Sequence, residues 1–299
     1  MKHTSDYLNE IARNSGSIFY ELTPEESVKL KNVLLDIYKD IKRVCDKHGI
    51  NVMLSGGSCL GAVRHKGYIP WDDDLDLMMS RVDYDKLKDI FDDELSDKYS
   101  ISVPRKSKES IALSMRIMKK GTLNPGVNDF NPDAENGISI DVFPIEKLPD
   151  NKFLRNLKCW YLDILRICVI SSSIYLTKNQ LMKESLANNK LYYYIRCVIG
   201  FFFSLFGRKR LYDYFDRVAS SSKGTKYSTI TTGRGMSRKE CVPTDVFFPP
   251  RKTVFEGFEV SIPNDADKYL SNLYGDYMKI PPVEKRERHF YIKLDFGDK

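Results

Sequence analysis

The sequence has no pair of cysteines at metal-binding or redox spacing. Its six cysteines are scattered and none stands in a CxxC motif, so a zinc ribbon or a dithiol redox site is not expected. Thiols in this pattern are typical of a reduced, cytosolic protein. Residues 1–16 contain no apolar core, which argues against a signal peptide. No stretch reaches the roughly 18 consecutive apolar residues that cross a bilayer, so a cytoplasmic location is expected.

A dense stripe of lysine and arginine is also missing, as are internal repeats and low-complexity tracts. Nucleic acid is therefore not an expected partner. The net charge of +6 instead favours phosphates, nucleotides or anionic lipid surfaces. With 42% hydrophobic and 29% charged residues, the composition is that of a folded globular protein and not of a disordered one.

Composition divides the chain into four parts. Residues 1–22 predict a loosely attached N-terminal arm, and residues 23–150 mix helices with strands. Residues 151–223 follow a helical pattern rich in tyrosine, leucine, isoleucine and phenylalanine, whereas residues 224–299 are mixed again. The expected fold class is α+β, a mixed sheet flanked by helices with an inserted, mostly helical region.

Local signals place the elements of the part that mixes helices and strands. Thr23, Pro24 and Glu26 are typical of a helix start, and Gly49 is expected to end that helix. Short apolar or alternating runs predict strands, and Pro144 is expected to end the last of them. The expected strands cover 50–54, 74–79, 100–103, 111–120 and 137–144, with a turn at 55–58 and helices at 24–48, 59–67 and 82–95.

The stretch WDDDLDLMM, residues 71–79, holds four carboxylates within five positions. Such crowding is unfavourable in water and more so in a core, so a cation is expected nearby, with a solvated strand edge as the alternative. Alternate residues of a strand share a face, which would put Asp72, Asp74 and Asp76 on one side and the leucines between them on the other. Two such carboxylates make a hard oxygen site for Mg²⁺ or Mn²⁺.

The stretch LSGGS just before this run offers an anion site. Gly56 and Gly57 let backbone N–H groups approach a phosphate closely, and Ser58 adds a hydroxyl near a helix N-terminus. Asp141, in GISIDVFP, supplies a third carboxylate that either completes the metal shell or takes a proton from an acceptor hydroxyl. A phosphate held beside a metal is the chemistry of phosphoryl and nucleotidyl transfer.

Further candidates are basic or aromatic. Those expected to neutralise the charge of a bound diphosphate are Arg64, His65 and Lys66. Those expected on the substrate side are Trp71, Asp72, Arg286, Arg288 and His289. Trp71 and three tyrosines are also candidates for an aromatic cage around a quaternary ammonium group: Tyr68, Tyr274 and Tyr277. Solvated surface charges and core aromatics are the alternatives for these residues.

Three stretches resemble, in order, the sequence blocks of the LicD family of phosphocholine transferases, which are related to fukutin-type sugar phosphotransferases. They are LSGGSCLGAVRHKGYIPWDDDLDLMM (54–79), GISIDVFPIEKLPD (137–150) and YLSNLYGDYMKIPPVEKRERH (269–289). Residues 151–223 carry little of this resemblance. The family often has Gly-Thr at the position of Gly57-Ser58, a change that keeps the hydroxyl.

The resemblance implies a nucleotidyltransferase-type fold in which 23–150 and 224–299 form one catalytic domain. It implies an enzyme of the cholinephosphotransferase type, which moves phosphocholine or a related phospho-alcohol from CDP-choline or a similar CDP-alcohol. The acceptor would be a sugar of a surface glycan such as teichoic acid, lipopolysaccharide or capsule. Mg²⁺ or Mn²⁺ would be held by Asp74 and Asp76, with Asp141 as the third carboxylate.

Two other functions stay open at this point. The same fold and metal would suit transfer of a nucleoside monophosphate, and a decayed relative would bind a glycan or lipid without catalysis. The intact set of Asp74, Asp76 and Asp141 argues against the second of these.

The stretch IRCVIGFFFSLFGRKR, residues 195–210, is apolar and then basic. It is either a buried core helix or an amphipathic hairpin that touches the membrane through Arg208, Lys209 and Arg210. A lipid-linked glycan acceptor would make such peripheral contact, at the inner face of the membrane, useful to the enzyme.

Overall fold

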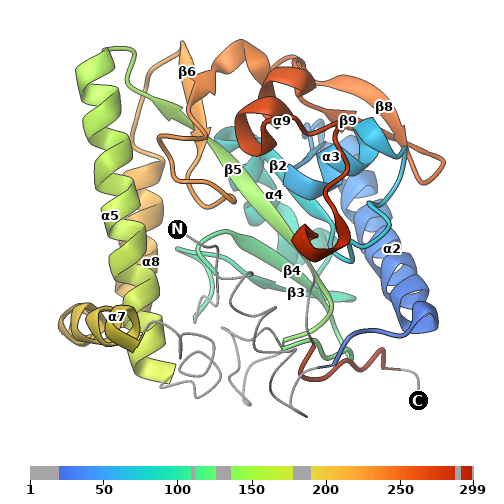
Figure 1. Ribbon diagram of the computed structural model, residues 1–299, viewed down its shortest axis with the longest axis horizontal. Coiled ribbons are helices and arrows are strands. Elements are labelled where there is room, and N and C mark those ends of the chain that lie inside the picture. Colours follow the sequence, from blue (N-terminus) through green and yellow to red (C-terminus); the bar gives the residue numbers. More distant parts are fainter. Residues whose placement is uncertain (1–19, 109–111, 126–135, 178–189, 287–290, 298–299) are drawn as a thin grey trace.

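The computed structural model describes residues 20–108, 112–125, 136–177, 190–286 and 291–297. Within them, seven strands form one mixed sheet, which runs β1-β2-β5-β4-β3 and continues through β6 and β7 along the far part of β5 (Figure 1). These strands are β1 (Met53–Leu54), β2 (Asp76–Ser80), β3 (Tyr99–Ser102), β4 (Met115–Lys119), β5 (Ser139–Leu148), β6 (Tyr227–Ile230) and β7 (Val242–Pro243). A separate hairpin pairs β8 (Arg251–Phe255) with β9 (Phe258–Ile262).

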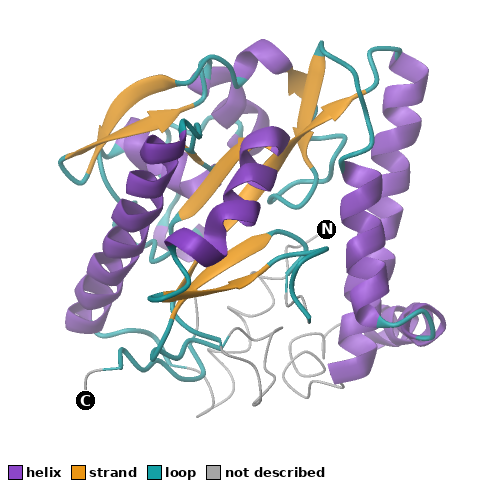
Figure 2. Cartoon of the chain, turned by 180° about the vertical axis from the view of Figure 1, so that it is seen from behind, coloured by secondary structure: helices purple, strands orange, loops and turns teal. Residues whose placement is uncertain are grey.

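Helices cover both faces of the sheet. In Figure 1, α3 and α9 lie in front of it, and Figure 2 shows α4 in front of the sheet from behind. The helices are α2 (Pro24–His48), α3 (Gly56–Arg64), α4 (Arg81–Glu94), α5 (Lys152–Thr177), α7 (Lys190–Ser204), α8 (Arg208–Ala219) and α9 (Ala266–Tyr274), with short 3-10 turns η2 (Thr244–Val246) and η3 (Val283–Lys285). The predicted α+β class is confirmed. Most of the predicted N-terminal arm lies outside the described residues.

Helix α2 forms as its sequence predicts. The Thr23 hydroxyl accepts the Glu26 N–H at 3.2 Å, and the Glu26 carboxylate accepts the Thr23 N–H at 2.9 Å. This capping box satisfies two groups that a helix start otherwise leaves unpaired. Gly49 ends the helix with φ at 64°, a conformation that glycine adopts without strain. The apolar stripe of α2, including Leu34, Ile37 and Ile41, is buried in the main core.

Strand β5 is the centre of the sheet. It runs parallel to β2 and antiparallel to β4 and β6. The prediction that Pro144 ends this strand is wrong, because β5 continues to Leu148. Pro144 lies between Val142, the last residue paired with β4, and Ile145, the first paired with β6. A proline is tolerated at this point because neither of these strands pairs with it there.

Among the other boundaries that differ from the predicted ones, two affect the candidate site. The predicted turn at 55–58 is the first turn of α3, which begins at Gly56 with φ at 46°. Strand β2 begins at Asp76 and not at residue 74. Asp72 and Asp74 therefore precede the strand. The alternation of faces along β2 does not determine where their side chains lie. Their position is set by the turn that leads into β2.

The helical region 151–223 has a core of its own. Apolar residues of α5 pack against α8, forming a cluster separate from the main core: Leu162, Leu165, Val169, Leu211, Tyr212, Phe215 and Ala219. By length and composition, α5 is also able to cross a membrane over Lys152–Leu176; its most apolar window of 18 residues has a mean hydropathy of 1.4, and 44% of that window is buried. The expectation of no such segment is therefore wrong. Asp163 and Arg166 interrupt the apolar run, and a core helix meets the same criterion.

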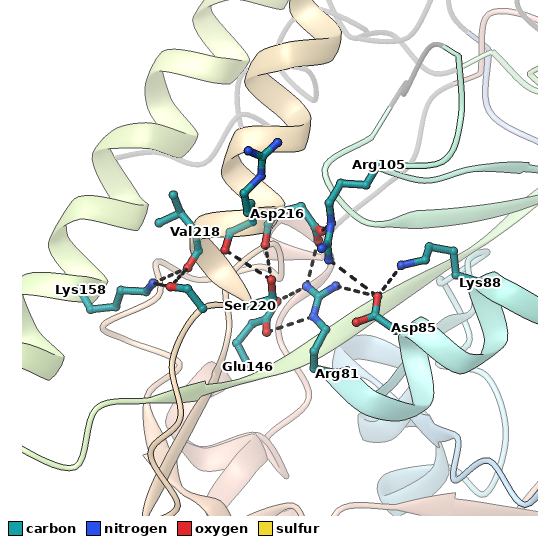
Figure 3. A network of polar contacts seen from close by, with 11 residues as sticks. Arg81, Asp85, Lys88, Arg105, Glu146, Lys158, Asp216, Val218 and Ser220 are labelled. Carbon is teal, nitrogen blue, oxygen red and sulfur yellow. Dashed lines mark hydrogen bonds and ion pairs between the residues drawn. The ribbon is translucent and has the colours of Figure 1, made fainter.

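A buried network of charges joins this helical region to the sheet (Figure 3). Arg81, at the start of α4, donates to Glu146 of β5 through Nε at 3.2 Å and through Nη2. The same Nη2 donates to Asp216 of α8 at 3.0 Å, and Arg105 donates to the other Asp216 oxygen. Burial alone would lower the pKa of Arg81, but the two carboxylates raise it, so the guanidinium stays charged.

We expect Arg81→Leu to lower the free energy of unfolding by about 3–5 kcal/mol, because it leaves the buried carboxylates of Glu146 and Asp216 without their shared cation. Urea denaturation measures this change. The matched control is Arg43→Leu, since Arg43 is 62% exposed and 3.7 Å from Asp40. The control should change stability by about 0.5 kcal/mol or less. Equal stabilities of the two variants would show that the network does not hold α8 to the sheet.

Candidate active site

Residues of α3 and α9 line a cavity of about 670 Å³. Figure 1 shows these two helices on the same face of the sheet. One wall comes from α3 and from residues 69–76, which precede and begin β2. The opposite wall comes from residues 232–240, from α9 and from the segment that follows it to Lys285. Residues far apart in the sequence therefore enclose one space.

The acidic run lies on this cavity. Asp72, Asp74 and Asp76 all line it, and two backbone contacts fix the last of them against α3. The Asp76 N–H donates to the Ser58 hydroxyl, and the Asp76 carbonyl accepts the Ser55 N–H, both at 2.9 Å. Asp73 turns elsewhere, because its carboxylate accepts the Tyr291 hydroxyl at 2.6 Å. The run thus divides into three acids at the cavity and one that anchors the C-terminal segment.

The two glycines of LSGGS make room for these acids. A Cβ on Gly57 would lie 3.0 Å from an Asp72 oxygen, and one on Gly56 would lie 3.5 Å from the Tyr274 hydroxyl. The start of a helix leaves its first N–H groups without intrahelical acceptors and carries partial positive charge. Both glycines line the cavity, so the positive end of α3 faces the same space as the acids. Ser58 is buried and does not line the cavity; its hydroxyl ties α3 to β2.

Asp141 stands beside Asp76 in the sheet but has a strong partner. The two are register neighbours on parallel strands. Arg116 of β4 donates to both Asp141 oxygens, at 2.8 and 3.2 Å. Asp141 is not among the cavity-lining residues, and within the described part of the chain no group of three histidine, cysteine or acidic side chains is placed to hold a metal. The metal-binding roles of Asp74, Asp76 and Asp141 stay predictions.

Of the basic residues after the glycines, only Arg64 lines the cavity. It donates to the Tyr277 carbonyl at 2.5 Å and to His65 at 2.9 Å. Burial and the Arg64 charge lower the pKa of His65, which favours the neutral imidazole at pH 7. Lys66 has φ at 60° and its carbonyl accepts the Glu256 N–H, so its backbone shapes the turn away from the cavity.

The aromatic candidates separate in the same way. Trp71, Tyr274 and Tyr277 line the cavity, whereas Tyr68 is buried and donates to the Lys31 carbonyl at 3.2 Å. The guanidinium of Arg286 lies 4.2 Å from the centre of the Trp71 ring, as in a cation–π contact. Arg288 and His289 lie outside the described residues.

The wall formed by residues 232–240 was not predicted from the sequence. It contributes Thr232, Gly233, Arg234 and Glu240 to the cavity. Glu240 is 3% exposed and accepts the Gly235 N–H. Burial raises the pKa of Glu240 to about 7, although this hydrogen bond opposes the shift. The sequence Gly233-Arg234-Gly235 could have indicated a loop that binds an anion. The residues around it do not indicate that this loop reaches the cavity.

Helix α5 holds this wall in place. Arg166 donates to the carbonyls of Gly233 and Gly235 at 2.9 and 2.8 Å. Asp163 accepts the Ser237 N–H at 2.7 Å. A Cβ on Gly233 would lie 2.8 Å from a Glu240 oxygen, so the chain can wrap this carboxylate only because the position is glycine. The helical region therefore helps to build the cavity.

Comparison with known proteins identifies the family that this part of the chain resembles. Residues 49–151 match the family described as LicD/FKTN/FKRP, nucleotidyltransferase domain. This stretch contains the start of α3, the acidic run and Asp141. The family resemblance predicted from the sequence is thereby confirmed.

Similarity to LicD proteins extends beyond that domain. The chain is 26% identical over 261 residues to the lipopolysaccharide cholinephosphotransferase LicD of Haemophilus influenzae, covering 86% of this chain and 93% of that protein. It is also 36% identical over 72 residues to an uncharacterised protein of Rickettsia prowazekii, covering 24% of this chain and 27% of that protein. The mixed sheet flanked by helices agrees with the nucleotidyltransferase-type fold expected of a LicD domain.

We expect Glu240 to make the folded protein less stable as pH rises from about 5 to 7. Its pKa of about 7 exceeds the ordinary 4.5, so in this window the folded state binds its proton more tightly than the unfolded chain does. Glu240→Gln should remove this contribution, and its stability relative to wild type should increase from pH 5 to pH 7. Urea denaturation at pH 5, 6 and 7 measures the effect.

The control for this prediction is Glu284→Gln, because Glu284 is exposed. Its stability should differ from wild type by the same amount at each pH. A Glu240→Gln curve that runs parallel to wild type would show that Glu240 titrates normally.

Proposed function

We propose that this protein transfers phosphocholine, or a related phospho-alcohol, from a CDP-alcohol to a sugar of a cell-surface glycan. The observation that supports this most is the cavity itself. It brings Asp74 and Asp76 against the positive end of α3 and beside Arg64, within a domain of the LicD family. The relative from Haemophilus influenzae is named as a lipopolysaccharide cholinephosphotransferase, which supports the transferred group and the class of acceptor.

Asp74 and Asp76 fit Mg²⁺ or Mn²⁺, because such ions are often bound by one or two carboxylates together with substrate phosphates. A bound ion would neutralise charge on the diphosphate of the donor. Arg116 occupies one position on each Asp141 oxygen, but a carboxylate has about four acceptor sites. Asp141 is therefore still proposed either as a third ligand or as the acceptor of the sugar proton.

Two groups of cavity residues are proposed to bind the donor. Those proposed to bind the diphosphate are cationic or carry a helix-start N–H group: Gly57, Arg64, Arg234 and Lys285. The Gly56 N–H already donates to the Tyr269 hydroxyl at 3.1 Å, so Gly56 is proposed to contribute close approach and not a free donor. Those proposed to contact the choline ammonium are Trp71 and Tyr274, whose rings line the same space. Arg286 already stacks on Trp71, so it would have to share that ring with a bound choline.

The transfer itself is a displacement at phosphorus. The hydroxyl oxygen of the acceptor sugar forms a bond to the phosphorus that carries choline, and the bond from that phosphorus to CMP breaks. CMP leaves with the bonding electron pair, and the hydroxyl proton passes to Asp141 or to solvent. Attack on the other phosphorus would move the nucleotide instead. Positioning and charge neutralisation are the main sources of rate enhancement in such reactions.

We expect Asp74→Asn and Asp76→Asn each to reduce transfer by about 100-fold or more, because each removes a charge that the bound ion requires. CMP release from CDP-choline, with Mg²⁺ and glycan stripped of phosphocholine, measures the rate. Asp93→Asn is the control, since Asp93 is exposed on α4. Near-normal activity in either cavity variant would overturn the metal assignment.

We expect chelation by EDTA to stop the reaction and added Mg²⁺ or Mn²⁺ to restore it. Mass spectrometry of the glycan should show a gain of phosphocholine matched by CMP. Release of pyrophosphate from a nucleoside triphosphate, with a nucleotide added to the acceptor, would support nucleotidyl transfer instead. Activity that survives thorough chelation would refute the metal-dependent mechanism.

A further inference from the structure

Helix α7 turns its apolar side away from the protein. Its large exposed side chains recur every three or four residues and form one stripe: Leu191, Tyr194, Val198 and Phe202. The opposite stripe packs on α5, where Arg196 donates to the Ser171 hydroxyl at 2.6 Å. A Cβ on Gly200 would lie 2.1 Å from the Ser171 carbonyl oxygen, so the helices are in close contact. The alternative of a buried core helix for 195–210 is therefore wrong.

Helix α5 carries a second exposed apolar stripe. Phe153, Leu157, Trp160 and Ile164 are all exposed, and Trp160 is 61% exposed. Figures 1 and 2 both place α5 and α7 together at one side of the molecule, outside the sheet. We call these two stripes, with Leu205 and Phe206, the outer apolar face. Exposed apolar side chains in such number are typical of a surface that binds a partner.

A basic cavity of about 650 Å³ borders the outer apolar face at the turn between α7 and α8. Lys108, Arg208, Lys209 and Arg210 line it together with Leu205 and Phe206. The two apolar side chains are 72% and 62% exposed. Three of these cations fall in the first turn of α8, which contains no acidic residue. Lys209 is ion-paired with Asp213 one turn on, at 2.7 Å. Cations are unfavourable at this end of a helix, so an anion bound in the cavity would add favourable contacts to those that the cluster already makes.

We propose that the outer apolar face binds the surface of a bilayer that contains anionic lipids. Headgroup phosphates would occupy the basic cavity, while Leu205, Phe206 and Phe202 enter the boundary between headgroups and acyl chains. Tryptophan and tyrosine are typical of that boundary, and Trp160 and Tyr194 supply them. Charge complementarity favours this occupant, because two copies joined through this same face would set the cations of the basic cavity against one another.

Binding in this way would place the membrane next to the helix that holds the cavity wall. The outward stripe of α5 belongs to the outer apolar face. Asp163 and Arg166 of the same helix hold residues 233–237 by hydrogen bonds. Access to a lipid-linked acceptor through this arrangement rests on the proposed function. Binding to vesicles does not, and it is measured without substrate.

The test is co-sedimentation of the full chain with vesicles of phosphatidylcholine, with or without about one third phosphatidylglycerol. We expect wild type to bind the anionic vesicles more strongly and 0.5 M salt to weaken this binding. Arg208→Gln, Lys209→Gln and Arg210→Gln together should weaken it about a hundredfold, because each basic residue near an anionic surface contributes roughly fivefold. The triple variant Phe202→Ser, Leu205→Ser and Phe206→Ser should abolish binding to the vesicles.

Two matched controls keep the result specific. Lys223→Gln, Lys252→Gln and Lys268→Gln remove the same net charge from exposed sites elsewhere, and Val28→Ser with Val82→Ser removes exposed apolar groups from α2 and α4. Both should bind like wild type, and circular dichroism checks that every variant is folded. Failure of wild type to bind would overturn the proposal. Equal binding by the variant changed at Arg208, Lys209 and Arg210 and by the variant changed at the three control lysines would also overturn it. A dimer that the serine variants make monomeric, without vesicle binding, would assign the face to a second copy.

Discussion

The parallel pairing of β2 with β5 is the constraint on which the candidate site depends. It sets Asp76 beside Asp141 and Leu77 beside Val142. A slip of one residue in either strand would exchange the faces of acids and apolar residues. That exchange would bury the Asp76 carboxylate on the face that now carries Leu77 and Met79, which are fully buried. The cost of burying an unpaired charge therefore fixes the register, and the register places the acids.

Charges in this protein are stabilised in two different ways. In the core, Arg81 is shared between Glu146 and Asp216, so the buried charges compensate one another. Around the cavity, acids from the turn before β2 and cations from α3 and from residues 232–285 face a common space. A bound metal and a diphosphate would complement both signs at once, since the acids attract the metal and the cations attract the phosphates.

Helix α5 connects three features that the sequence presents separately. Its buried stripe packs on α8, whose Asp216 joins the charge network with β5. Its Asp163 and Arg166 hold the wall that carries Arg234 and Glu240 into the cavity. Its outward stripe is apolar and exposed. A region that looks like an insertion in the sequence thus supports the cavity of the candidate site on one side and presents a surface on the other.

The sequence by itself determined the fold class, helix α2 with its capping box, and the order in which a glycine-rich turn is followed by an acidic run. These follow from short-range chemistry, which acts within a few residues and needs no knowledge of neighbours. Only the tertiary structure decided which residues reach the cavity. Ser58 and Lys66 lie in the predicted motif but make structural contacts, whereas Arg234 and Glu240 come from a distant loop held by Arg166. The ion pair of Asp141 with Arg116 likewise depends on strand pairing across 25 residues, which spacing along the chain does not reveal.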